Sequence, residues 1–243
     1  MTVQEFSNEF DVLYNNIMSN QAPGLDEYEK SVFLTKAQYE IVKNYFNPRG
    51  NKYGEGIDDS PKRQIDFSTL ITAAEPTTYA SPGYVKFDDR SHLYKMPNDI
   101  FIVLNETGIN TVDGTSRLIS IIPINYGEYT RLMSKPFKQP LKNQGWRLFN
   151  STGGVDFVSE VIVKHNSVLS DYKIRYVRRP KPIILANLAD EYSNVSIEGE
   201  SRISECELDP ILHPEILQRA VELAKSAYVG DLKSSVELGQ RSE

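Results

Sequence analysis

The chain has 243 residues, of which 40% are hydrophobic and 25% charged, the ordinary composition of a folded globular protein. Its formal net charge of -6 at neutral pH is opposite to the basic surface of proteins whose main task is to grip nucleic-acid phosphates. No apolar run reaches the roughly 20 residues that a membrane-spanning helix needs, so we expect no membrane partner.

Two helices are predicted in residues 1–47. Thr2 suits the N-cap of the first helix, and Glu5 three residues later completes a capping box. After a Pro-Gly turn, Asp26 suits the N-cap of the second helix, which ends before Pro48 because proline cannot continue a helix. An antiparallel helix hairpin is the simplest arrangement of the two.

A β-rich body is predicted for residues 64–208, after a glycine-rich exposed loop at 48–63. Short segments rich in β-branched and aromatic residues indicate a mostly antiparallel sheet, with one short helix at 126–133 that ends before Pro136. Residues 74–98 contain three prolines and predict an irregular excursion, either an insertion or a contact arm. The predicted strands are 64–72, 99–106, 117–124, 146–150, 157–165, 172–177 and 182–185.

The last segment, residues 209–243, predicts a long amphipathic helix followed by a tail. Asp209 or His213 can cap this helix, Pro214 suits its first turn, and Gly230 ends its apolar stripe. Two interpretations of the stripe stay open: it packs on the chain's own sheet, or it is shared with a neighbouring subunit. The expected fold is therefore α+β: an N-terminal helix hairpin, a β-sheet body and a C-terminal helix, in one folded unit.

Basic and aromatic residues are interleaved in the basic strand region 172–181, which begins with the predicted strand 172–177. In one interpretation Tyr172 and Tyr176 stack on bases while the cations hold phosphates, which would make a nucleic-acid-binding module. In the other interpretation, the same alternation describes an amphipathic strand with one solvated face. The candidate subunit or DNA contacts are Lys173, Arg175, Arg178, Arg179 and Lys181.

Little in the sequence indicates catalysis, so no cofactor site and no metal site is predicted. Cys206 lies between two glutamates, whose charges disfavour its thiolate form and argue against a nucleophile. It is the only cysteine, so no disulfide can form within the chain, and we expect the protein to fold in a reducing cytoplasm. A metal-dependent hydrolase remains a third hypothesis, although paired aspartates in loops more often form turns. That hypothesis rests on two pairs, Asp58 with Asp59 and Asp88 with Asp89.

Three segments carry a family resemblance: LDEYEKSVFLTKAQYEIV, IIPINYGEYTRLMSKPFKQPLKNQGWRLF and ECELDPILHPEILQRAVELAKSAY. They resemble structural proteins of crAss-like bacteriophages, specifically the connector or tail ring components between portal and tail. The central matching residues, which we interpret as fold determinants, are Pro123, Glu128, Tyr129, Arg131, Leu132, Pro136, Phe137, Lys138, Pro140, Trp146, Arg147 and Leu148. The C-terminal matching residues are Leu212, His213, Ile216, Ala220, Val221 and Leu223.

The resemblance implies a non-enzymatic virion protein with no catalytic residue to carry over. It implies a homo-oligomeric ring in the phage neck or tail, a dodecamer that matches a portal, with the portal and other tail ring proteins as partners. The genomic DNA would pass through the lumen of this ring without sequence-specific binding. Assembly would take place in the host cytoplasm, and the assembled protein would be part of the virion.

Overall fold

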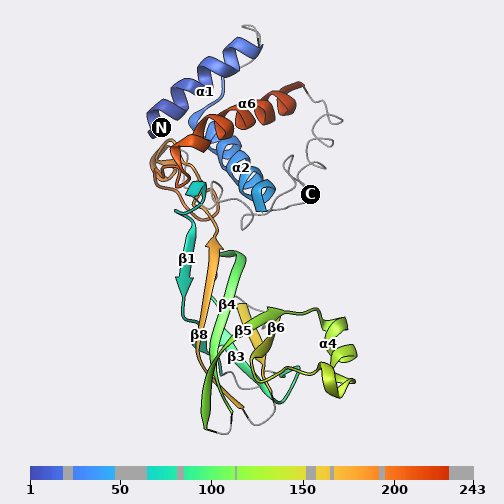
Figure 1. Cartoon of the computed structure of the whole chain (residues 1–243). Helices are drawn as coiled ribbons and strands as arrows, with labels where there is room; N and C mark the ends of the chain where they lie inside the picture. Colours follow the sequence, from blue (N-terminus) through green and yellow to red (C-terminus); the bar gives the residue numbers. More distant parts are fainter. Residues whose placement is uncertain are drawn as a thin grey trace. The chain divides into compact units, whose positions relative to one another are not determined.

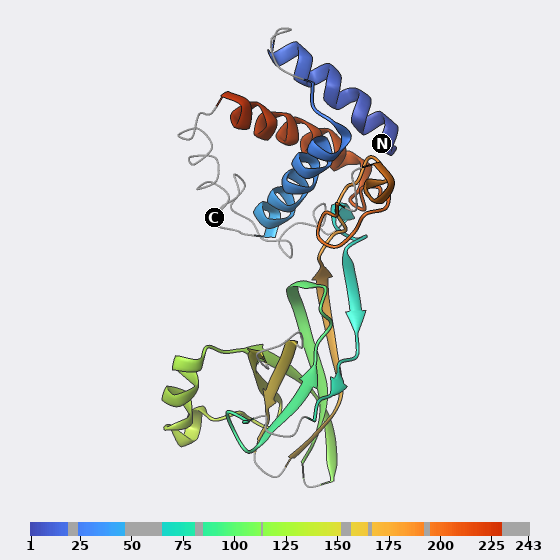
Figure 2. The same ribbon diagram turned by 180° about the vertical axis from the view of Figure 1, so that it is seen from behind.

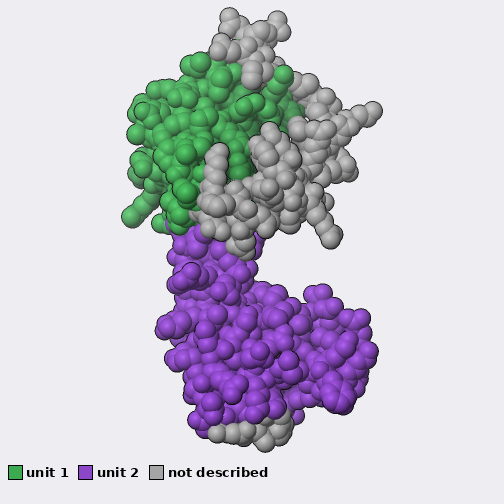
Figure 3. All heavy atoms as spheres, in the orientation of Figure 1, with its two compact units in different colours: residues 1–70, 180–243 green, residues 71–179 purple. Residues whose placement is uncertain are grey.

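The computed structural model describes residues 1–18, 24–46, 65–80, 85–112, 114–151, 157–164, 167–191 and 195–229. These residues form an α+β protein, as predicted (Figure 1). The chain divides into two compact units, residues 1–70 with 180–243 and residues 71–179 (Figure 3). Residues 65–70 and the described residues of 180–208, which are predicted to be part of the β-rich body, belong to the unit that contains the helices.

The first unit is built around three helices, α1 (Val3–Met18), α2 (Glu27–Phe46) and α6 (His213–Val229). Figures 1 and 2 show α6 lying beside both α1 and α2, and residues of all three helices are buried against one another. The apolar side chains of α6 are therefore buried against helices of its own chain, whereas the sequence left two interpretations open, packing on the chain's own sheet or sharing with a neighbouring subunit. The described part of this unit also contains α5 (Leu188–Glu191) and the 3-10 turn η3 (Pro210–Leu212).

Both N-terminal helices begin as the sequence predicts. The Thr2 amide donates to Glu5 Oε2 at 2.7 Å, and the Glu5 amide donates to Thr2 Oγ1 at 3.3 Å. Asp26 and Glu29 make the same reciprocal pair at the start of α2, with distances of 2.7 and 3.1 Å. Each box satisfies backbone N–H groups that have no partner inside the helix.

Side chains of α2 hold the extended segment 180–185, part of which is predicted as a strand. Ser31 Oγ accepts the Leu185 amide at 3.0 Å, and Thr35 Oγ1 accepts the Ile183 amide at 3.1 Å. Gln38 Nε2 donates to the Lys181 carbonyl at 2.8 Å. Side chains of the helix thus bond several backbone groups of residues 180–185. The bridge recorded for this segment is the isolated one between Ile184 and Ser204.

The second unit is an eight-stranded sheet with the order β1-β8-β4-β5-β6-β7-β3-β2. Among these strands β5 and β6 pair in parallel and the other neighbours pair antiparallel, so the sheet is mixed. The strands are β1 (Ile71–Ala74), β2 (Thr77–Thr78), β3 (Ser91–Lys95), β4 (Ile100–Val112), β5 (Thr115–Pro123), β6 (Gln144–Ser151), β7 (Phe157–Ile162) and β8 (Ser167–Arg178).

One continuous stretch of chain, residues 71–78, joins both ends of the strand order. Its first half, β1, pairs with β8, and its second half, β2, pairs with β3. The sheet therefore curls round until the same stretch touches its first and last long strands, which leaves little free edge. Inside the curl lie buried residues that include Tyr94, Ile119, Ile121, Val161, Tyr172 and Ile174.

The structure also corrects the strand predictions at two places. The strand predicted at 64–72 begins only at Ile71, after a turn at 65–70 that packs with the helical unit. The excursion at 74–98 is not irregular throughout, because β2 and β3 lie in it and complete the sheet. The helix predicted at 126–133 is present with those bounds as α4 (Tyr126–Met133).

Candidate subunit-contact surfaces

The basic strand is β8, and its side chains alternate between the inside and outside of the curled sheet. Tyr172 and Tyr176 are buried, whereas Lys173 and Arg175 are exposed. The buried rings have no free face on which a base could stack, so the geometry is that of the amphipathic strand and not of a stacking platform. The Lys173 Nζ atom lies 3.1 Å from Oε1 of Glu75, the residue that follows β1.

Arg178, Arg179 and Lys181 continue this strip at the end of β8 and beyond it. Arg178 is half-buried and interacts with another group, while Arg179 and Lys181 are exposed. Lys181 lies beyond the boundary of the β-sheet unit, so the five candidate residues belong to two units.

The next candidates are the four aspartates of the hydrolase hypothesis, which have different surroundings in the structure. Asp58 and Asp59 lie outside the described residues. Asp88 is buried and accepts two hydrogen bonds from the Arg90 guanidinium, at 2.8 and 3.0 Å, and one from the Tyr129 hydroxyl. Asp89 is exposed. Within the described ranges, no three side chains that could bind a metal ion come together.

None of the described helices is long and apolar enough to cross a membrane.

Asp88 belongs to a cluster that docks α4 on the sheet. The Phe87 ring meets the Tyr126 and Tyr129 rings edge-on, with centroids 5.3 and 4.7 Å apart. Glu160 on β7 holds the loop under this cluster, because its Oε1 accepts the amides of Phe87 and Asp88 at 2.7 and 3.0 Å. Sequence reasoning missed this role of Glu160, since nothing in the sequence shows that β7 lies beneath residues 87–91.

The arm, which we define as residues 126–142, carries α4 and the 3-10 turn η2 (Pro136–Lys138) before the chain enters β6. Neither α4 nor η2 contains a buried residue. The inner face of α4 packs on the sheet through residues that are only partly buried: Tyr129, Leu132 and Met133 lie on Trp146, Leu148 and Ile162. Figures 1 and 2 both show α4 projecting to the side of the sheet.

Phe137, at the centre of η2, is 98% exposed. Leu141 further along the arm is 58% exposed, and Leu118 on β5 is 72% exposed. Ile122 of β5 is also exposed and pairs with Trp146, which α4 covers, so the outer row of β5 runs beside the base of the arm. We call Leu118, Ile122, Phe137 and Leu141 the arm patch.

The residues interpreted as fold determinants therefore fall into two groups. The buried members are Pro140, Trp146, Arg147, Leu148, Leu212, His213, Ile216, Ala220 and Val221, while Leu132 and Leu223 are half-buried. Tyr129 is partly buried and bonded to Asp88. The exposed members, which packing within the chain does not account for, are Pro123, Glu128, Arg131, Pro136, Phe137 and Lys138.

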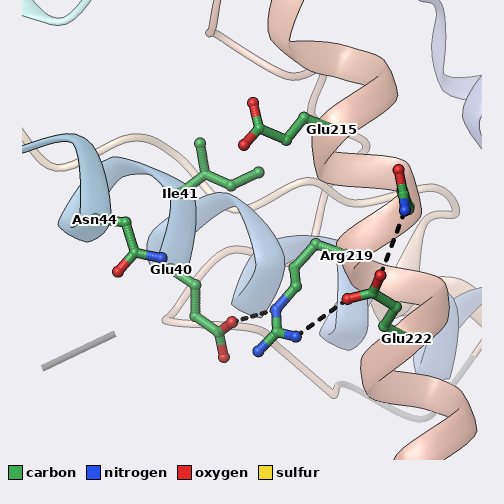
Figure 4. A pocket seen from close by; sticks show the side chains of 7 residues that line it. Glu40, Ile41, Asn44, Glu215, Arg219 and Glu222 are labelled. Atoms are coloured by element: carbon green, nitrogen blue, oxygen red, sulfur yellow. Dashed lines mark hydrogen bonds and ion pairs between the residues drawn. The ribbon is translucent and has the colours of Figure 1, made fainter. Parts of the chain in front are cut away.

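A pocket of about 260 Å³ opens between α2 and α6 (Figure 4). Arg219 lies at its centre, with its Nε 2.6 Å from Glu40 and its Nη1 3.2 Å from Glu222. Glu215 adds a third carboxylate, which accepts a hydrogen bond from Tyr45 at 3.2 Å. Three carboxylates around one guanidinium leave this surface acidic.

Two residues that the sequence singles out have structural partners in the helical unit. His213 contacts the Met1 amine through Nδ1 at 2.7 Å and the Leu208 carbonyl through Nε2 at 3.0 Å, and burial lowers its pKa. The Cys206 thiol donates to Gln38 Oε1 at 3.4 Å, and burial raises its pKa to about 11. Such a thiol is a poor nucleophile, for a reason that sequence reasoning assigned to its acidic neighbours and the structure assigns mainly to burial.

Comparison with known proteins adds a family to this geometry. Residues 1–235 match the family described as phage tail ring protein 3/4. The chain is 62% identical over 244 aligned residues to "Ring protein 4/5" of Bacteroides phage crAss001, covering all of both chains. It is also 33% identical over 230 residues to "Ring protein 3" of the same phage, covering 92% of this chain and 95% of that one.

Proposed function

The chain belongs to the phage tail ring protein 3/4 family, and we propose that it is a non-enzymatic structural subunit of a ring in the tail or neck of a crAss-like phage. The family match over residues 1–235 carries this proposal. The full-length likeness to a protein named for a ring supports it further. The resemblance seen in the sequence and the family membership thus agree.

The described surfaces are consistent with a subunit that works through contacts. In a ring, each subunit presents one surface to the next copy and a different surface to the previous one. The exposed arm patch and the acidic surface between α2 and α6 lie on different units of this chain, so it has two chemically distinct surfaces of this kind. Neither surface contains a set of groups arranged as a nucleophile with its base.

The finer assignment is a twelvefold ring that docks on the portal or on other tail rings and lets the genome pass. Its support is the resemblance and the net charge of -6, which a ring repeats in every subunit. Repeated negative charge around a channel repels DNA phosphates, so the genome would slide and not adhere. A ring structure whose channel wall proved strongly basic would contradict this part.

Electron microscopy and native mass spectrometry test the proposal directly. The purified chain should form a closed, rotationally symmetric assembly, alone or mixed with the other tail ring proteins, and the finer assignment gives it twelve copies of the 27.6 kDa chain. Monomers that assembled with neither the portal nor the other ring proteins would overturn the proposal. A closed ring of another copy number would overturn only the dodecamer.

A further inference from the structure

Phe137 is an unusual side chain for the surface of a protein that works alone. It is 98% exposed, and it lies between Pro136 and Lys138 in the short turn η2, which contains no buried residue. Large aromatic side chains contribute most to packing when they are desolvated, and they are enriched at the centres of protein interfaces. In this chain nothing among the described residues covers the ring, so its place in the fold does not explain it.

Other apolar side chains of the same unit are exposed as well. Leu141 lies on the same arm, and Leu118 and Ile122 occupy the outer row of β5, next to the strand on which α4 packs. Large exposed apolar patches on soluble proteins commonly mark an interaction site. Pro136, the first residue of η2, and Pro140, two residues after its end, restrict the backbone, so the arm loses little conformational freedom when a partner covers it.

The charge of the arm indicates what kind of surface would cover it. Residues 126–142 contain four basic residues and one acidic residue, and the acidic one, Glu128, is already 3.4 Å from Arg131. Lys135 and Lys138 are exposed and lie on either side of Phe137 in the sequence, while Lys142 already interacts with another group. A complementary partner therefore offers carboxylates around an apolar contact.

A second copy of this chain has that property. Its net charge is -6, although the arm itself is basic. Its helical unit gathers Glu40, Glu215 and Glu222 around the pocket between α2 and α6, where Ile41 adds an apolar wall. Contact between the arm of one copy and an acidic surface of the next joins two different surfaces, and repetition of such a contact with the right rotation closes a ring.

We infer that the arm patch, centred on Phe137, is covered in the assembled ring by the adjacent copy of this chain. This inference rests on the proposed function and assigns a surface to it. The family name and the aligned relatives identify no contact residue, so the assignment comes from exposure, position and charge. Phe137 acts in it as the central anchor, with the lysines beside it guiding the approach of an acidic surface.

Substitution of Phe137 is the first test. Phe137→Ser should leave the thermal unfolding midpoint of the isolated subunit unchanged, because the ring makes no contact that folding needs. It should raise the subunit concentration needed for half-assembly of the ring about tenfold or more. Ile203→Ser provides a matched control, since Ile203 is an exposed apolar residue of the other unit and should assemble like the wild type.

Charge reversal is the second test. Lys135→Glu combined with Lys138→Glu should weaken assembly more at low salt than at high salt, because salt screens the attraction that the lysines provide. Arg202→Glu, at an exposed position of the other unit outside α2 and α6, is the control that changes charge outside the arm and outside the acidic surface. Equal effects of the arm and control substitutions would overturn the assignment of charge to the arm.

A photoreactive benzoyl-phenylalanine at position 137 identifies the occupant. Adducts between two copies of the chain in assembled rings would support the inference, whereas adducts only with another tail protein, or none, would overturn it. Rings that form with Phe137→Ser as readily as with the wild type would overturn it too, while the proposed function stood. Failure of the wild-type chain to assemble under any condition, including with other ring proteins, would overturn both.

Discussion

Asp88 links the loop before β3 to α4 through a buried carboxylate. Burial alone would raise its pKa, but hydrogen bonds from Arg90 and Tyr129 outweigh this and hold the pKa of Asp88 below its ordinary value of 3.8. Because the pKa is lower in the folded protein, the stabilisation is complete above the ordinary value and is lost as the pH falls through the lower folded value. Docking of α4 should therefore weaken in acid, below about pH 4.

Asp88→Asn tests this link. The substitution should cost about 1–3 kcal/mol of α4 docking near neutral pH, and it should remove the local acid dependence. Trp146, the only tryptophan of the chain, lies under α4, so its fluorescence reports on the docking. Asp89→Asn, at the exposed neighbouring position, is the control; a variant at position 88 that retained the wild-type acid response would contradict the assignment.

A second prediction concerns the ion pair inside the curled sheet. Arg147 Nε lies 2.7 Å from Glu106 Oε1, both side chains are buried, and the Tyr172 hydroxyl donates to Glu106 Oε2 at 3.2 Å. Burial raises the pKa of Glu106 and lowers that of Arg147, so each group depends on the other to remain charged. The pair therefore favours this one arrangement of β4 and β6 around it.

Removing one partner should harm the fold more than removing both. Arg147→Met leaves a buried carboxylate uncompensated and should lower the free energy of unfolding by about 3–5 kcal/mol. Adding Glu106→Leu to it should recover most of that loss, because an apolar pair replaces an ion pair whose desolvation is costly. Urea unfolding followed by circular dichroism gives both values, and additive losses in the double variant would show that the two groups do not interact.

At the scale of elements, the contact between α2 and residues 180–185 gives the next prediction. Thr35 accepts the Ile183 amide and donates to the Ile183 carbonyl at 3.3 Å, so one hydroxyl satisfies two buried backbone groups. Thr35→Val keeps the volume but leaves both groups without a partner, which should cost about 1–3 kcal/mol for each. Thr35→Ser keeps the hydroxyl and should lose much less. Equal unfolding free energies for the two variants would contradict this account.

This contact also shows which parts of the fold the sequence could predict. Local signals were reliable: the boxes at Thr2 and Asp26 place two helix starts, and the apolar spacing of 126–133 places α4. Residues 182–185 have the composition of a strand, but a helix face satisfies their backbone, and no local pattern distinguishes these two environments. The two strands in 74–98 were missed for a similar reason, since their pairing partners lie elsewhere in the chain.

For the candidate site, too, the sequence predicts local features but not which side chains the fold buries. Alternation in 172–181 indicated correctly that cations lie outward on β8, but only the fold shows that Tyr172 and Tyr176 are buried. Phe137 belongs to a segment that resembles the family, and for that reason it is interpreted from the sequence as a fold determinant. Its exposure depends on how far α4 and η2 stand from the sheet, which is a property of the assembled unit.

At the scale of the whole molecule, the order of the chain makes one unit an insertion in the other. Residues 71–179 form a continuous segment, whereas the helical unit is made from the parts on either side. The two ends of the insertion lie together, because Ile71 and Val177 are partners in the pairing of β1 with β8. A segment whose ends meet can be excised without stretching the chain that remains.

The last prediction is that residues 71–179 fold independently. Their sheet is closed by their own stretch 71–78, and its interior is filled by the segment's own side chains, so the cut exposes no strand that needs the helices. The fragment should unfold cooperatively, and its Trp146 fluorescence should match that of the full chain, in which this side chain is buried. Arg147→Met should lower the free energy of unfolding of the fragment by about the same amount as in the intact protein. Because it contains the arm, it should also retain Phe137 in its exposed position, where added quencher or a photoreactive substitute reaches it. An unfolded or aggregated fragment, beside a full chain that folds normally, would show that the sheet depends on the helical unit despite its closed strand order.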